Sequence, residues 1–137
     1  MDGSERMKKA EREDFPCLPM PERQDLFLIE KELTEEQMRR LSLGHIPHSM
    51  EDKWFYYMEG NKLFIHRSWT GFCIYTVELS PDGCHEVTVN RDPQQYSCQE
   101  IGEDEKNLSD LLDAFTDQDY DPYRQWLSET AGNLRLR

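Results

Sequence analysis

Two short turn sequences in the middle of the chain restrict it to closely connected antiparallel strands. Glu59-Gly60-Asn61-Lys62 has the form of a two-residue β-hairpin turn, in which Gly60 can adopt a positive φ angle. Ser80-Pro81-Asp82-Gly83 is the second turn, because proline presets φ and glycine accepts a left-handed conformation. Aromatic residues precede the first turn and β-branched residues flank the second, and both kinds favour strands. The sequence therefore predicts a β-meander between Lys53 and Val89.

The turn positions also predict which residues face one another across the strands. With Gly60 and Asn61 at the tip of the first hairpin, Trp54 lies beside Arg67 at its open end. A three-residue loop at the second turn aligns a candidate core face, which consists of Cys73, Tyr75, Val77, Leu79, Val87 and Val89. The turn at residues 68–71 leaves two registers open, because a two-residue and a three-residue loop place opposite faces of the first hairpin against the core.

Strand and helix signals continue on both sides of the meander. Residues 25–30 form a short apolar run that predicts a first strand. Thr34 and Gln37 have the spacing of a helix capping box, and Gly44 is placed to end that helix. A later helix is predicted from one apolar stripe, Leu108, Leu111, Leu112 and Phe115, and a last helix begins at Asp121. These elements predict an α+β fold, a twisted antiparallel β-meander with helices packed on one face.

The first 24 residues predict a flexible charged arm with a proline-rich end. Pro16, Pro19 and Pro21 lie close together, and the segment offers little apolar surface to offset the entropy of ordering it. Residues 25–137 are then expected to form a single α+β domain.

Charge and cysteine spacing exclude several classes of partner. The chain carries 16 basic and 28 acidic residues, a net charge of −12, which disfavours nucleic acid polymers and acidic membrane surfaces. No apolar run is long enough for a signal peptide or a membrane span. The four cysteines lack zinc-site spacing, so reduced thiols in a cytoplasmic protein are expected, with no metal and no cofactor. A homo-oligomer is compatible with the sequence.

One segment combines side chains that suit an anionic ligand with a flat ring. An arginine can hold a phosphate through two parallel hydrogen bonds, a lysine adds a point charge, hydroxyls donate, and an indole stacks on a base. The candidate ligand-binding residues are Lys53, Trp54, Arg67, Ser68, Trp69 and Thr70. His66 is a weak candidate for a general base, and a structural, hydrogen-bonded histidine is the alternative. A purely structural interpretation is also open, with Arg67 stacked on Trp54 and Trp69 filling the core.

The same residues resemble a known family. Lys53-Trp54-Phe55 and the run from His66 to Tyr75 resemble a small uncharacterised bacterial and phage family that has an R-S-W-T-G motif. Its members occur beside or fused to ADP-ribosylglycohydrolase and macrodomain proteins. The resemblance covers about Ile46 to Leu79, with a weaker similarity at Leu108 to Phe115. It implies chemistry related to ADP-ribose or NAD only through that context.

Three functions are open at this point. The first is a small-nucleotide binding protein whose ligand is ADP-ribose-like or a related nucleotide signal, which it sequesters in a conflict between phage and host. The second is a hydrolase or transferase that acts on ADP-ribosyl linkages, with His66, Glu51 and Asp52 as the available groups. The third is an acidic protein-interaction module.

Overall fold

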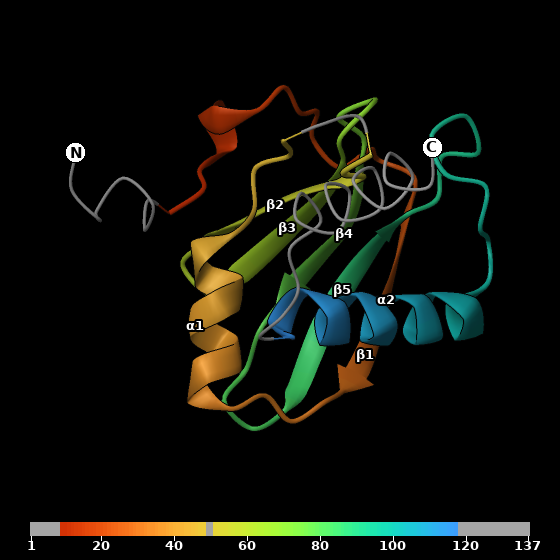
Figure 1. Cartoon of the computed structure of the whole chain (residues 1–137). Helices are drawn as coiled ribbons and strands as arrows, with labels where there is room; N and C mark the ends of the chain where they lie inside the picture. The colour runs from red at the N-terminus through yellow and green to blue at the C-terminus, as the bar shows by residue number, and fades with distance from the viewer. Residues whose placement is uncertain (1–8, 49–50, 118–137) are drawn as a thin grey trace, which may run out of the picture.

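The fold is a five-stranded antiparallel sheet with two α-helices on one face (Figure 1). The computed structural model describes residues 9–48 and 51–117. The strands lie in the order β1-β5-β4-β3-β2. The elements are η1 (Arg12–Asp14), β1 (Gln24–Glu30), α1 (Glu35–Leu43), β2 (Trp54–Glu59), β3 (Lys62–Arg67), β4 (Cys73–Glu78), β5 (Cys84–Asn90) and α2 (Ile101–Thr116). The predicted α+β class and the predicted meander of β2 to β5 are confirmed.

Both predicted hairpin registers are confirmed. Trp54 pairs with Arg67 across β2 and β3, and Val77 pairs with Val87 across β4 and β5. Gly60 adopts the positive φ of 62° that the first turn requires. The local turn sequences therefore suffice to align these strands.

The core lies between the sheet and the two helices. Leu41 of α1 and Leu108, Leu112 and Phe115 of α2 are buried against the sheet. Phe115 stacks on Tyr56 of β2, with ring centroids 4.0 Å apart. The predicted apolar stripe of α2 is therefore the face that α2 buries.

A β-bulge changes the face on which one predicted core residue lies. Ile65 pairs with Tyr75, but its neighbour His66 pairs with Cys73, so Ile74 is the extra residue. Ile74 joins the core beneath the helices, while Cys73 is buried beside His66 on the other face. The prediction that Cys73 shares the face of Tyr75 is wrong, because the bulge interrupts the period of two. The turn between β3 and β4, whose length the sequence left undecided between two and three residues, contains four residues, 68–71. The Arg67 N–H closes it by donating to the Phe72 carbonyl oxygen at 2.9 Å.

On the second face of the sheet, the part formed by β2 and β3 is covered by residues from the segment that the sequence assigned to a flexible arm. Ala10 is buried, and its N–H donates to the Leu43 carbonyl oxygen at 2.7 Å. The Phe15 ring lies 5.5 Å from the Phe55 ring. Ala10, Phe15 and Cys17 of this segment pack against the aromatic side chains on this face of β2 and β3, which α1 and α2 do not cover.

Two predictions lie outside the described residues, namely the start of the arm at residues 1–8 and the helix from Asp121. Within the described part of the chain, no helix is long and apolar enough to cross a membrane.

Candidate functional site

The candidate site lies where the start of β2, the β3–β4 turn and the loop after β5 meet. Lys53 directly precedes β2, and Arg67 ends β3, so the pairing of Trp54 with Arg67 brings both cations to the same end of the sheet. They border a hollow of about 420 Å³. Its lining residues are Lys53, Arg67, Trp69, Thr70, Phe72, Gln94 and Gln95. We call this hollow the cationic hollow.

A second hollow lies against Arg67 and extends toward α2. It has a volume of about 380 Å³ and is lined by Trp54, Arg67, Tyr75, Tyr96, Asn107, Asp110 and Leu111. We call it the helix hollow. The Arg67 guanidinium is common to the two hollows and lies over the Trp54 ring, 5.0 Å from its centroid. The predicted cation–π pair is therefore present, and its arginine also borders both hollows.

The local charge of the cationic hollow is opposite to that of the whole chain. Within residues 9–48 and 51–117, neither Lys53 nor Arg67 forms an ion pair with a carboxylate. No carboxylate or histidine of this described part lines the cationic hollow. In a chain of net charge −12, this leaves two positive charges available to an anion.

The predicted ligand-binding residues divide between the hollow and the scaffold. Trp69 is 70% exposed, so it does not fill the core. Thr70 lines the hollow, and its hydroxyl oxygen accepts a hydrogen bond from the Phe72 N–H at 3.3 Å, which leaves its proton for another acceptor. Ser68 instead serves the scaffold: its hydroxyl donates to the Asp52 carbonyl oxygen at 2.6 Å, and its N–H donates to the Lys53 carbonyl oxygen at 2.9 Å.

His66 lies on the opposite face of the sheet from Arg67, because neighbouring residues of a strand alternate between faces. Its ring is buried, stacks on Tyr57 at 5.6 Å, and shares a hydrogen bond of 3.0 Å between Nδ1 and the Gly71 carbonyl oxygen. Burial lowers the pKa of His66, the Gly71 carbonyl opposes this, and the Arg12 guanidinium lowers the pKa further. The structure thus separates His66 from the other candidates and gives it a structural role.

The lowered pKa of His66 predicts a loss of stability in mild acid. The folded protein holds this imidazole neutral, while the unfolded chain takes up a proton below a pH of about 6.5. The free energy of unfolding should therefore fall as the pH decreases from 6.5, by at most about 1.4 kcal/mol per pH unit from this group. Urea unfolding between pH 7 and pH 5 measures it. The difference between wild type and His66→Gln should shrink over this range, and a constant difference would contradict the burial of a neutral ring.

The carboxyl group of Asp52 is fully buried beside the site and does not enter the cationic hollow. One carboxylate oxygen shares a short hydrogen bond with Nε2 of His45, and the same oxygen accepts the His48 N–H at 3.3 Å. The hydrolase or transferase hypothesis names Asp52 as one of the groups available as a base or nucleophile. Its contacts instead fix the loop that leads into β2, and with it Lys53.

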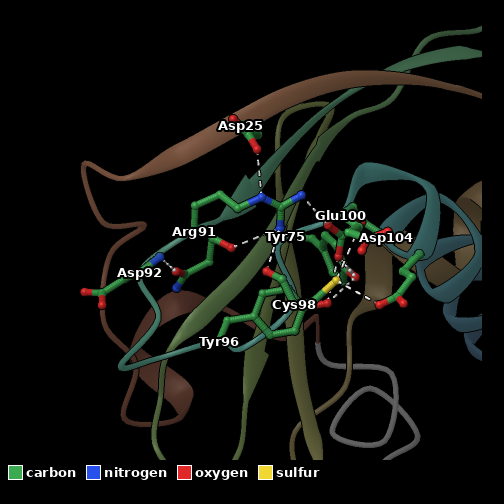
Figure 2. Close-up of polar contacts among 10 residues, drawn as sticks. Asp25, Tyr75, Arg91, Asp92, Tyr96, Cys98, Glu100 and Asp104 are labelled. Atoms are coloured by element: carbon green, nitrogen blue, oxygen red, sulfur yellow. Dashed lines mark hydrogen bonds and ion pairs between the residues drawn. The ribbon is translucent and has the colours of Figure 1, made fainter.

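A buried polar network, which no sequence pattern indicates, connects β4 and the loop after β5 to α2 next to the site (Figure 2). The hydroxyls of Tyr75 and Tyr96 donate to one oxygen of the Asp104 carboxylate at 2.9 and 2.7 Å. The other oxygen lies 2.6 Å from the Arg91 guanidinium, whose Nε donates to Asp25 at 2.7 Å. Asp104 is completely buried.

This network joins the loop after β5 to α2. Arg91 and Tyr96 belong to that loop, and Asp104 lies in the first turns of α2. Asn90 adds a hydrogen bond of 2.9 Å from its side-chain amide to the Gln95 side-chain oxygen. The loop is thereby held where Gln94 and Gln95 line the cationic hollow. No sequence signal could have shown this, because the three partners of the Asp104 carboxylate come from separate positions of the chain. An acid early in a helix ordinarily serves the helix dipole.

In the described part of the chain, no group of three or more His, Cys, Asp or Glu side chains is placed to hold a metal ion. The arrangement suits noncovalent binding of an anion between two cations, next to an exposed indole. The resemblance to the family with the R-S-W-T-G motif stays a prediction: no protein-family model, curated protein or solved structure gives a significant match to this chain.

Proposed function

We propose that the protein binds a small nucleotide, with the phosphate held between Lys53 and Arg67. The observation that carries this proposal is the pair of cations without carboxylate partners in the described structure, which line one hollow together with an exposed indole. Arg67 can present two parallel N–H donors to a phosphate, and Lys53 adds a compact charge. The Thr70 hydroxyl supplies a further donor.

The two hollows suit the two ends of such a ligand. Trp69 offers a flat surface at the cationic hollow, and base stacking on an aromatic side chain contributes about 1–3 kcal/mol in proteins that bind single strands. On the other side of Arg67, the helix hollow presents Asn107 and Asp110. An amide and a carboxylate can accept hydrogen bonds from ribose hydroxyls or from an exocyclic amine. A ligand that occupies both hollows, on either side of Arg67, therefore contacts cations at one end and hydrogen-bond acceptors at the other.

Among nucleotides, an ADP-ribose-like molecule is the ligand we propose, because of the resemblance to the family with the R-S-W-T-G motif. Sequestering such a signal in a conflict between phage and host is the corresponding biological role. We place binding ahead of hydrolysis or transfer, since no described histidine or carboxylate lines the cationic hollow, where the phosphate would lie. The Asp110 carboxylate lines the helix hollow, on the other side of Arg67. Among residues 9–48 and 51–117, no contact favours the acidic protein-interaction module.

Isothermal titration calorimetry with ADP-ribose, NAD and cyclic nucleotides tests the proposal. We expect saturable binding of at least one of them, weakened by added salt because the contact is charged. Absence of binding to every member of this panel would refute the proposal. Release of free product from an ADP-ribosylated substrate would support the hydrolase instead.

Arg67→Lys is expected to weaken nucleotide binding about ten- to a hundredfold while the protein stays folded. The substitution keeps the charge but removes the two-pronged geometry, and a charge-assisted hydrogen bond contributes about 1.5–3 kcal/mol. Loss of stacking on Trp54 costs only about 0.5–1 kcal/mol at an exposed site. The measurement is calorimetric affinity together with the melting temperature.

The matched control is Arg39→Lys, which makes the same change on the exposed face of α1, where Arg39 pairs with Glu36. Its affinity should equal that of wild type. Lys53→Ala is the second test of the hollow, because it removes the other cation without touching the Trp54 stack. Wild-type affinity in both Arg67→Lys and Lys53→Ala would show that the ligand binds elsewhere.

A further inference from the structure

Strand β1 ends the sheet on one side and carries two exposed leucines. It pairs with β5 alone in the described structure, so its other edge has no strand beside it. Leu26 and Leu28 are 62% and 60% exposed, and they lie on the face away from α1 and α2. Proteins usually protect such edges with charges, prolines or bulges. The seven residues of β1 contain neither a proline nor a lysine, their charges are the carboxylates of Asp25 and Glu30 near the two ends, and the pairing with β5 is unbroken.

The hydrogen bonds at both ends of β1 show which backbone groups face the open edge. The Arg91 N–H donates to the Arg23 carbonyl oxygen, and the Lys31 N–H donates to the Gly83 carbonyl oxygen, both at 2.8 Å. Hydrogen-bonded residues alternate along an antiparallel pair, so the odd-numbered residues of β1 bond to β5. The even-numbered residues, which include Leu26 and Leu28, therefore direct their N–H and C=O groups away from the sheet.

We propose that β1 pairs with β1 of a second copy of this chain, antiparallel about a two-fold axis at Phe27. In this register Leu26 lies opposite the partner's Leu28, and Gln24 lies opposite the partner's Glu30. All of these residues are even-numbered, so their outward N–H and C=O groups meet as hydrogen-bonded pairs. The exposed leucines of both copies then form one apolar cluster on the face away from the helices, and the two sheets become one.

Charge is compatible with this register at each position of the strand. Gln24 faces the carboxylate of the partner's Glu30, and Asp25, which Arg91 binds at 2.7 Å, lies opposite the partner's Ile29. No two like charges within β1 are opposed. The net charge of −12 on each copy opposes association over longer distances. Dimerisation should therefore be stronger at about 0.5 M salt than at about 0.05 M, because salt screens that repulsion.

Sedimentation velocity on the full chain across a concentration series tests the dimer. We expect wild type to show a monomer–dimer equilibrium, and Leu28→Lys to weaken it by about tenfold or more, since lysine on an edge strand blocks strand addition. The matched control is Leu18→Lys, which makes the same change at another exposed leucine outside β1. It should dimerise as wild type does.

A second variant tests the backbone pairing itself. Leu26→Pro removes an outward N–H and no bond to β5, so it should abolish the dimer, while Leu26→Thr retains the N–H and should dimerise more strongly than the proline variant. Circular dichroism confirms that each variant is folded. A wild type that stays monomeric at about 0.1 mM protein in about 0.5 M salt would overturn the proposal. A dimer that persists in both Leu28→Lys and Leu26→Pro would also overturn it, because the copies would then meet through another surface.

Discussion

Asp104→Ala is expected to lower the free energy of unfolding by about 3–5 kcal/mol. The substitution removes the acceptor of both tyrosine hydroxyls and one of the two carboxylates bound to Arg91. Arg91 is almost completely buried. In the variant its guanidinium would keep only one of its two carboxylate partners, and little water could replace the one that is lost. Urea unfolding followed by circular dichroism measures the loss.

Glu105→Ala is the control, because it removes an exposed carboxylate from the next position of α2. Its effect should lie within about 0.5 kcal/mol. Asp104→Asn keeps the shape and loses the charge, so its stability should fall between the two alanine variants. Because the network holds the loop after β5, the folded Asp104→Asn protein should also bind nucleotide more weakly. A loss below about 1 kcal/mol in Asp104→Ala would show that the network does not stabilise the fold.

Gly44→Ala is expected to cost about 2–4 kcal/mol, since backbone strain and steric overlap act together. Gly44 has a φ of 71° and a ψ of −169°, a conformation almost restricted to glycine. A β-carbon at this position would lie 2.6 Å from the Tyr56 carbonyl oxygen and 2.7 Å from the Ala10 β-carbon. The segment that covers the second face would be pushed off the sheet. Thermal unfolding and proteolysis of residues 9–18 measure the two effects.

The Gly60→Ala variant distinguishes the cost of backbone strain from the cost of steric overlap. Gly60 also has a positive φ, of 62°, but no atom lies within 4 Å of the position that its β-carbon would take. It should therefore cost only about 1–2 kcal/mol. Equal losses in the two variants would contradict a close contact between Gly44, β2 and the segment at Ala10.

Local sequence signals predict most of this fold. The turns at Gly60 and at Pro81-Asp82-Gly83 fix two hairpin registers by themselves, and Thr34 with Gln37 forms the predicted capping box. Such features depend on residues within a few positions of one another. The differences concern relations between distant segments. The packing of Ala10, Phe15 and Cys17 on the sheet and the bulge at Ile74 both depend on contacts that no short window of sequence contains.

The same distinction applies to the site. The pairing of Trp54 with Arg67 follows from one turn, so sequence alone brings Lys53 and Arg67 together. The remaining residues that line the site come from the loop after β5 and from α2. Tertiary contacts, among them those of Asp104, place these segments at the site. Residues such as Gln95 and Asn107 carry no signal of their own.

The most direct test of the nucleotide site is a titration of ¹⁵N-labelled protein with ADP-ribose, followed through the indole N–H resonances by nuclear magnetic resonance. Trp69 lines the cationic hollow and Trp54 lines the helix hollow, so each reports on one side of Arg67. Trp→Phe variants at each position assign the resonances. Of the three indole signals of wild type, those of Trp54 and Trp69 should shift to saturation with one affinity. In Arg67→Lys the same shifts should need about ten- to a hundredfold more ligand. If neither indole resonance moves at saturating ADP-ribose, or if Arg67→Lys leaves the titration unchanged, the nucleotide does not bind at Arg67.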